Sequence, residues 1–437
     1  MADVKAFKGF RFAINKAEEL GKHCAPPYDM IDDAMIETLY AKDERNVVRI
    51  TQNRREASDS ANKDRHVRAA GFFKEWIDKG IIVQDDGDSV YIYRQQFTTE
   101  QNGQTVSHER TGICVLVKLV AFEEQVVFPH EYTLSGPKQD RYELMETTKS
   151  NTGQIFGLAT DDDGKFYAMI RKIMESAALV GVFTDENSVT HTLYRCTDAA
   201  LISETTFLMK TRNILIADGH HRYETALRFY RDQKSEDFSH VMMTLVSMAD
   251  PGLVIRPFHR LVRKSSMGKA VTDMKSELSR YFHLEPLGKV SAETISETLA
   301  KKAETEIVFW DSVNGDLTGL RLNAGGEEFL KNTMPQQSDN WKHLDVSKIN
   351  AIIINGILEL PLDGHVLHDI VNYVNDVSSG ALQLTKHSSE FYGGFFIRPM
   401  SISVVNETVK GGERMPQKST NFFPKLYSGL VFNRMQK

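Results

Sequence analysis

The spacing of apolar residues changes repeatedly along the chain between a helical and an extended period. Apolar positions three and four apart predict helices, for example over 67–79 and 165–176. Short apolar or alternating runs predict strands, for example over 90–97 and 112–119. Helices and strands follow one another without the regular spacing of a doubly wound sheet, so the pattern predicts a mixed α/β or α+β fold. We expect further helices over 139–147, 268–281, 292–304 and 362–377, and further strands over 47–51, 154–159, 214–217, 241–248, 307–310 and 394–399.

Local signals in the first hundred residues predict a small α/β unit. Pro26 and Pro27 fix φ and exclude a helix before them, so residues 25–29 should form a rigid extended segment. Asp32 is placed to cap the helix that follows it. The sequence Gln-Asn-Gly at 101–103 suits the turn of a hairpin.

The length of the chain predicts more than one folded unit. At 437 residues, and at ~100–200 residues per domain, it should form roughly two to four domains. No low-complexity tract or obvious linker divides it, so the boundaries come from the pattern alone. We predict an N-terminal α/β domain over 1–108, a central domain over 109–262 and a C-terminal α/β domain over 263–437.

Composition narrows the class of protein. Hydrophobic residues make up 41% of the chain and charged residues 26%, a balance typical of soluble globular proteins. The net charge of −6 argues against a wide phosphate-binding surface, so nucleic acid is not the expected partner. No apolar run approaches the ~20 residues of a membrane helix, and the N-terminus lacks the apolar stretch of a signal peptide. Cys24, Cys114 and Cys196 are too far apart for a zinc or disulfide motif, which favours a reduced, cytoplasmic location.

The most informative segment runs from residue 213 to residue 230. An apolar run over 213–217 predicts a buried strand, Asp218 follows at its carboxyl end, and Gly219 permits a tight turn. Beyond the turn, apolar residues at helical spacing predict a helix. Because the first turn of a helix presents free N–H groups and the positive end of the dipole, this strand–turn–helix is a candidate anion site.

The first turn of this helix carries the residues His220, His221 and Arg222. Cations are disfavoured there by ~0.3–1 kcal/mol each, so an anion bound by these donors would account for their position. Asp218 is then placed to hold Mg²⁺ against that anion. Two other interpretations remain: the histidines cap and pack, or they bind zinc, which adjacent helical positions disfavour because they point in different directions.

The residues Ala-Asp-Gly-His-His-Arg-Tyr-Glu-Thr-Ala at 217–226 resemble the signature of the ParB/sulfiredoxin-like superfamily, especially its free serine kinases. In those kinases a DGHHR turn binds nucleotide phosphates, and the glutamate of an upstream Pro-His-Glu segment is the catalytic base. Pro129-His-Glu131 stands in the matching order here, and the longer separation implies an insertion over 161–208. The resemblance implies that the central domain has this fold and that Glu131 is the base.

The rest of the sequence resembles a large prokaryotic family of unassigned function, of the DUF1015 type, which shares this signature. The matching segments lie at 25–29, 129–131, 136–141, 217–226, 250–261 and 415–430. The resemblance spans nearly the whole chain. It identifies the family, whereas the activity follows only from the narrower kinase comparison.

The chemistry of phosphoryl transfer assigns roles to the residues of the motif. Glu131, Asp218 and His221 are the predicted catalytic residues, with Mg²⁺ on Asp218 and Glu131 accepting the proton of the incoming hydroxyl. The predicted phosphate-binding residues are Gly219, His220, His221 and Arg222.

Three basic residues outside the motif are candidate substrate ligands. Lys138 and Arg141 are placed to clamp a carboxylate or phosphate, although solvated charges at a helix start are the alternative. Lys418 follows a glycine pair but lacks the glycine that precedes the lysine of a Walker loop, so that label is rejected. His365 and His368 have acceptable metal-ligand spacing without an evident third ligand, and exposed helix residues are the preferred interpretation.

The leading hypothesis is a nucleotide-dependent small-molecule kinase that uses ADP or ATP with Mg²⁺ and phosphorylates free L-serine or a similar hydroxylated amino acid. The main alternative is a nucleotide-binding regulatory switch, binding CTP or ATP without phosphotransfer. A sulfiredoxin-like reductase is disfavoured because His220 stands where its cysteine would be expected. The expected partners are the nucleotide and the amino acid, and a homodimer is left open.

Overall fold

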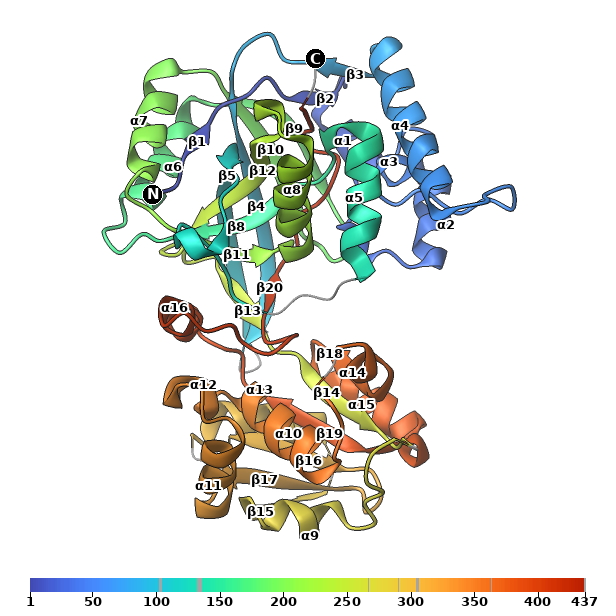
Figure 1. Cartoon of the computed structure of the whole chain (residues 1–437), viewed down its shortest axis with the longest axis vertical. Helices are drawn as coiled ribbons and strands as arrows, with labels where there is room; N and C mark the ends of the chain where they lie inside the picture. Colours follow the sequence, from blue (N-terminus) through green and yellow to red (C-terminus); the bar gives the residue numbers. More distant parts are fainter. Residues whose placement is uncertain are drawn as a thin grey trace.

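The computed structural model describes residues 1–101, 104–131, 136–265, 267–289, 291–303, 306–362 and 364–435. The chain forms two lobes, an upper lobe built around a nine-stranded sheet and a lower lobe built around a six-stranded sheet (Figure 1). Both ends of the chain lie in the upper lobe (Figure 1). The fold is α+β, as the sequence predicts.

The upper sheet mixes parallel and antiparallel strands in the order β6-β11-β8-β12-β5-β4-β10-β9, with β1 paired to β5. Two neighbouring pairs are parallel, β11 with β6 and β12 with β8. The strands are β1 (Val4–Lys5), β4 (Val90–Gln101), β5 (Gln104–Lys118), β6 (Val127–Pro129), β8 (Ile155–Ala159), β9 (Ala178–Thr184), β10 (Thr190–Cys196), β11 (Ile214–Asp218) and β12 (His240–Ser247).

Each face of the upper sheet has its own apolar core, because successive residues of a strand point to opposite faces. On β5, Ile113, Val115 and Val117 pack in one core with residues of α6 and α8. Cys114 and Leu116 belong to the core that contains the C-terminal residues. The helices of this lobe are α1 (Leu20–His23), α2 (Asp33–Lys42), α3 (Val48–Thr51), α4 (Asn62–Asp78), α5 (Gly136–Thr148), α6 (Lys165–Ser176), α7 (Ala199–Met209) and α8 (His220–Gln233).

The lower lobe is an antiparallel sheet in the order β15-β17-β16-β19-β14-β18. Its strands are β14 (His259–Arg263), β15 (Phe282–Lys289), β16 (Ile307–Asp311), β17 (Asp316–Leu322), β18 (Val371–Val374) and β19 (Phe391–Ile397). Its helices are α9 (Met274–Ser279), α10 (Ala292–Lys301), α11 (Ala324–Thr333), α12 (Asp339–His343), α13 (Asp345–Lys348), the π-helical segment Ile349–Ile357, α14 (Gly364–Ile370) and α15 (Val377–Lys386). None of the helices in the described part of the chain has the length and hydropathy needed to cross a bilayer.

The C-terminal segment leaves the lower lobe and completes the upper one. After α16 (Ile402–Lys410), β20 (Asn421–Phe423) pairs with β13 (Val254–Arg256), between the lobes in Figure 1. Phe432 then exchanges backbone hydrogen bonds with Phe10. The remaining short elements are β2 (Phe10–Phe12), β3 (Ile82–Gln84), β7 (Ser150–Asn151), β21 (Asn433–Arg434) and the 3₁₀ turns Ala17–Glu19, Tyr28–Met30, Phe122–Glu124, Glu236–Phe238 and Ser388–Glu390.

Strand pairing does not follow the predicted domain boundaries. The boundary at 108 falls inside β5, which pairs with β4 on one side and with β12 on the other. The boundary at 262 falls inside β14. The segment after α16, predicted to belong to the last domain, pairs with strands β13 and β7.

Most predicted elements are present, and four predictions are wrong in whole or in part. The extended segment predicted over 25–29 ends at Pro27, because Tyr28–Met30 forms a 3₁₀ turn. In place of the strand predicted over 47–51, Val48–Thr51 form helix α3, because Val48 and Ile50 are buried in a core shared with α4. The helix predicted over 362–377 ends with α14 and continues as β18, and only Met274–Ser279 is helical within 268–281. Asp32 caps α2 as predicted, accepting from the Met35 N–H at 2.8 Å. The predicted turn at 101–103 includes two residues outside those that the structure describes.

Candidate active site

The predicted strand–turn–helix is confirmed by β11, Gly219 and α8. Strand β11 is buried up to Asp218, which lies at its carboxyl end, and His220 begins α8. Gly219 has φ 93°, in the left-handed region that favours glycine. A Cβ on Gly219 would also lie 2.9 Å from Nε of Arg222, so both the backbone and the close guanidinium require glycine here.

Asp218 is an ionised carboxylate between two cations. Its Oδ1 accepts from Nζ of Lys425 at 2.7 Å, and its Oδ2 accepts from Arg222 at 2.8 Å. Burial opposes ionisation, but the charges of Lys425 and Arg222 outweigh it and hold the pKa of Asp218 well below its usual range. Lys425 is a site residue that sequence reasoning missed, although Phe-Pro-Lys at 423–425 is one of the segments on which the resemblance to a DUF1015-type family rests.

The side chains around Asp218 do not fit the predicted Mg²⁺ site. Both of its oxygens already bind cations, whereas a protein-bound Mg²⁺ needs a carboxylate free to coordinate it. In the part of the chain that the structure describes, no three His, Cys, Asp or Glu side chains form a metal-binding group. The side chains of His365 and His368 lie outside the described residues.

The structure brings Glu131 to the turn. Strand β6 runs parallel to β11 with Pro129 opposite Ile216, so the residues after β6 lie beside the turn that follows β11. Oε1 of Glu131 is 4.0 Å from Nδ1 of His220. Within the described part of the chain its buried Oε2 has no hydrogen-bond partner, and it lies 4.0 Å from Nε2 of His130. The chain between the two motifs, which contains the predicted insertion, does not keep them apart.

His130 connects this carboxylate to the C-terminal segment. Its Nδ1 lies 2.6 Å from the Ile216 carbonyl oxygen, which can only accept, so Nδ1 carries the proton. The neutral Nε2 then accepts from the hydroxyl of Thr420 at 2.6 Å. The backbone N–H of His130 donates to Nε2 of His220 at 3.4 Å, which leaves the proton of His220 on Nδ1, toward Glu131. Hydrogen bonds thus set both tautomers.

The histidines of the motif are neutral near pH 7. Burial lowers the pKa of His220 well below 6.5, and the neighbouring His130 lowers it further. Burial also lowers the pKa of His221, against the raising effect of Glu224. The prediction of three cations on the first turn of α8 is wrong, because only Arg222 is charged and Asp218 pairs with it. The predicted anion site therefore depends on the N–H groups of α8 and on the Asp218 cluster.

The three predicted substrate ligands lie in different surroundings. Lys138 forms an ion pair with Glu224 on α8. Arg141 is buried, contacts Asp140 and donates to the Thr51 carbonyl at 2.7 Å. Lys418 is exposed in the C-terminal segment, with Nζ 5.3 Å from the centre of the Phe258 ring.

Comparison with known proteins shows the family. Residues 4–347 match the family described as protein of unknown function (DUF1015), and the chain belongs to this family. No curated protein matches the chain.

Solved structures give distant similarities. A free serine kinase in complex with AMP is 12% identical with a TM-score of 0.35, and the match covers 71% of this chain and 86% of that one. A conserved hypothetical protein from Pyrococcus furiosus is 13% identical with a TM-score of 0.34, over 72% of this chain and 92% of that one. SbnI with a C-terminal truncation, from Staphylococcus aureus, is 10% identical with a TM-score of 0.37, over 74% and 87%.

Proposed function

We propose that this protein is a nucleotide-dependent small-molecule kinase, which transfers a phosphoryl group from ADP or ATP to the hydroxyl of free L-serine or a similar amino acid. One observation carries the proposal. Glu131, beside the N-terminus of α8, has a buried carboxylate oxygen for which the described residues provide no hydrogen-bond partner. A carboxylate held in that state is able to accept a proton from a bound hydroxyl.

In the proposed reaction the acceptor hydroxyl gives its proton to Oε2 of Glu131 as its oxygen bonds to the transferred phosphorus. The bond between that phosphorus and the nucleotide oxygen breaks, and the nucleotide leaves with the electron pair. Neutral His220 carries its proton on Nδ1, 4.0 Å from Oε1 of Glu131, on the side that faces the carboxylate.

The phosphates would be bound by the first turn of α8 and by the Asp218 cluster. Backbone N–H groups at a helix N-terminus favour an anion. Lys425 and Arg222 share one carboxylate, so the cluster keeps one positive charge to set against phosphate. Mg²⁺ is added to the assay as the counter-ion of the nucleotide. None of the steps assigned above to the residues of this site requires it.

Phosphorus NMR tests the proposal directly. The full chain is incubated with Mg²⁺, ADP or ATP, and L-serine, beside a Glu131→Gln variant. A phosphomonoester resonance that appears with the wild type and is lost in Glu131→Gln is the expected result. A spectrum unchanged by the wild-type protein would overturn the kinase proposal.

A second candidate function is a nucleotide-binding switch without phosphotransfer. The observation that favours it is that the segment leaving the lower lobe contacts the site: the Met415 N–H donates to the His130 carbonyl at 2.8 Å, and Thr420 and Lys425 contact His130 and Asp218. A ligand at the turn would therefore act on a link between the lobes. Turnover and nucleotide affinity, measured together for Glu131→Gln, separate the candidates, because a kinase loses turnover at constant affinity, whereas a switch has no turnover to lose.

A further inference from the structure

A small cavity lies beside the motif, where Arg222 of α8 faces Arg141 of α5. Its volume is about 40 Å³. Because a cavity needs roughly 10–15 Å³ to hold one water, there is room for a group of about three heavy atoms and none for a nucleoside. The polar residues relevant to its chemistry are Tyr28, Arg141, Thr152, Arg222 and Ser428.

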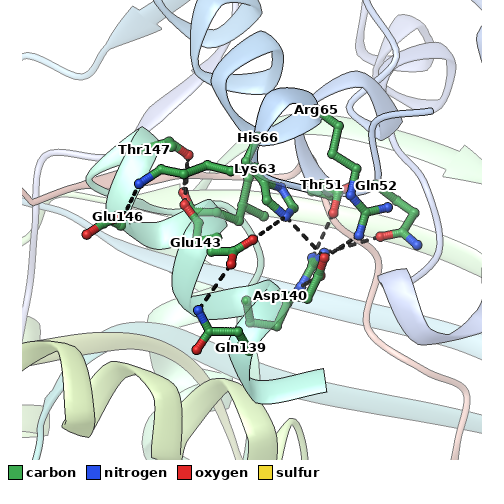
Figure 2. Close-up of polar contacts among 12 residues, drawn as sticks. Thr51, Gln52, Lys63, Arg65, His66, Gln139, Asp140, Glu143, Glu146 and Thr147 are labelled. Carbon is green, nitrogen blue, oxygen red and sulfur yellow. Dashed lines mark hydrogen bonds and ion pairs between the residues drawn. The ribbon is translucent and has the colours of Figure 1, made fainter. Parts of the chain in front are cut away.

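The two arginines that line the cavity belong to similar charge clusters. Arg141 shares Asp140 with Arg65, and Figure 2 shows this carboxylate of α5 facing Arg65 and His66 of α4. Arg222 shares Asp218 with Lys425. At Asp218 one carboxylate balances only one of two cations, whereas the cluster of Arg65 and Arg141 contains a second carboxylate on α5, Glu143, beside the same His66 nitrogen as Asp140. The cavity thus lies between two guanidinium groups and beside one net positive charge, in a protein whose overall charge is −6.

Glu143 is another carboxylate on α5, and it belongs to the Asp140 cluster. Its Oε2 lies 4.0 Å from the His66 nitrogen that also contacts Asp140, and it accepts from Gln139, as Figure 2 shows, but it is not among the residues that line the cavity. The excess positive charge at the cavity is therefore that of the Asp218 cluster, where Arg222 and Lys425 share one carboxylate.

The lining side chains also carry hydrogen-bond donors. Arg222 uses one terminal nitrogen on the Gln154 carbonyl at 2.5 Å and the other on Asp218, and its buried Nε has no partner among the residues that the structure describes. Burial raises the pKa of Tyr28 to about 12, so its hydroxyl keeps its proton. A Cβ on Gly153 would lie 3.3 Å from Oγ of Ser428 and 3.7 Å from Arg222, so this glycine keeps the space between them open.

We propose that this cavity binds the carboxylate of the amino-acid acceptor, with Arg141 and Arg222 as its ionic partners and Tyr28 as a neutral donor. The assignment rests on the proposed kinase function and names its substrate class as α-amino acids. A guanidinium matches a carboxylate in shape and charge, and the volume suits that group. Lys138 is not part of this site, because Glu224 pairs with it.

Titration calorimetry on the full chain with bound nucleotide tests the assignment without requiring turnover. The probes are L-serine, 2-aminoethanol, which has the hydroxyl and the amine but no carboxylate, and inorganic phosphate. The variants are Arg141→Gln and Tyr28→Phe. Arg171→Gln is the control, because this arginine is exposed and pairs with Glu109 away from the cavity.

We expect the wild type to bind L-serine at least tenfold more tightly than 2-aminoethanol. Arg141→Gln should weaken L-serine about 10- to 100-fold and leave 2-aminoethanol unchanged, because hydrogen bonds to charged groups are the stronger ones. Tyr28→Phe should weaken L-serine about 3- to 10-fold, and Arg171→Gln should have no effect. If Arg141→Gln does not fold, the L-serine affinity of Tyr28→Phe alone tests the assignment.

Three results would overturn the assignment. The first is equal wild-type affinity for L-serine and 2-aminoethanol, and the second is an L-serine affinity that is unchanged in both variants. The third is displacement of L-serine by inorganic phosphate, which would make this a phosphate site. Failure of the kinase proposal looks different. In that case phosphorus NMR shows no phosphoserine, although L-serine still binds in a manner that depends on Arg141 and Tyr28.

Discussion

Two buried histidine clusters in the upper lobe differ in whether they leave a polar atom unpaired. The cluster on β10 is closed. Nδ1 of His191 lies 2.6 Å from the Tyr93 hydroxyl, and its Nε2 lies 3.2 Å from Oδ2 of Asp185. Asp185 also accepts from the N–H groups of Asn187 and Val189. Every one of these ring and carboxylate atoms has a partner inside the protein.

The cluster beside α8 leaves a buried carboxylate oxygen unpaired. His130 uses both ring nitrogens and its N–H, and His220 accepts that N–H, yet Oε2 of Glu131 has no hydrogen-bond partner among the described residues. A satisfied buried network rigidifies a fold, whereas an unpaired buried oxygen costs stability. The comparison indicates that the β10 cluster stabilises the fold and that the Glu131 cluster keeps an acceptor for a ligand.

The largest expected effect comes from removing that acceptor. Glu131→Gln keeps the shape of the side chain but cannot take a proton, so kcat should fall about 10²- to 10⁴-fold. Nucleotide affinity should stay within twofold, because the contacts of the phosphate turn are unchanged. Initial rates and nucleotide titration measure the two quantities. A parallel loss of nucleotide affinity would count against the role of Glu131 as a base.

Breaking the closed cluster should change stability and not catalysis. His191→Phe leaves Asp185 and the Tyr93 hydroxyl each short of one buried hydrogen bond, at about 1–3 kcal/mol apiece. The free energy of unfolding, measured in urea, should fall by about 2–5 kcal/mol, with kcat of the folded protein unchanged. A folded variant with impaired turnover would remove the distinction between the clusters.

Lys425→Met tests the charge beside the Glu131 cluster. It leaves Asp218 paired with Arg222 alone, so the net positive charge at the turn disappears. We expect the Kd for nucleotide to rise about tenfold, equivalent to ~1.4 kcal/mol. Lys418→Met is the matched comparison from the same segment and should change this Kd less than threefold. Equal effects of the two variants would argue against a local role for Lys425.

Thr420 gives a smaller, conformational test. Thr420→Val keeps the volume but leaves Nε2 of His130 without a donor, which should lower the free energy of unfolding by about 1–2 kcal/mol. Thr420→Ser keeps the hydroxyl and should restore most of this loss. Nitrogen NMR of the His130 ring should report a changed environment at Nε2 in Thr420→Val only. Identical ring signals in both variants would contradict the assigned hydrogen bond.

Lowering the pH should gradually reduce the stability that both histidine clusters give to the fold. Burial holds the pKa of His130, His191 and His220 below 6.5 in the folded chain, so the unfolded chain binds protons more readily. Stability is therefore fully present above pH 6.5 and is lost as the pH falls below it, by up to about 1.4 kcal/mol per unit for each histidine. Urea unfolding between pH 7.5 and 5 measures the slope. His191→Phe should reduce it, and an unchanged slope would show that His191 does not contribute.

The sequence predicts those parts of the fold and site that depend on neighbouring residues. An apolar run predicts strand β11, a glycine predicts the turn at Gly219, and apolar residues at helical spacing predict helix α8. Each of these signals acts over a few residues. Residues 47–51 show where this fails: β-branched residues favour a strand, but burial against α4 selects a helix. The approach of Glu131 to the turn was predicted only through resemblance to a family.

The sequence by itself determined the α+β class, the family and the position of the motif, because periodicity, turn chemistry and a specific run of residues are all local. Only the tertiary structure decided which groups the motif contacts. Lys425 is 207 residues from Asp218, and Thr420 is 290 residues from His130, so no local preference relates them. The return of the C-terminal segment to the upper lobe and the parallel register of β6 with β11 bring them together. Burial there makes the histidines neutral, because a charged imidazole away from water is costly.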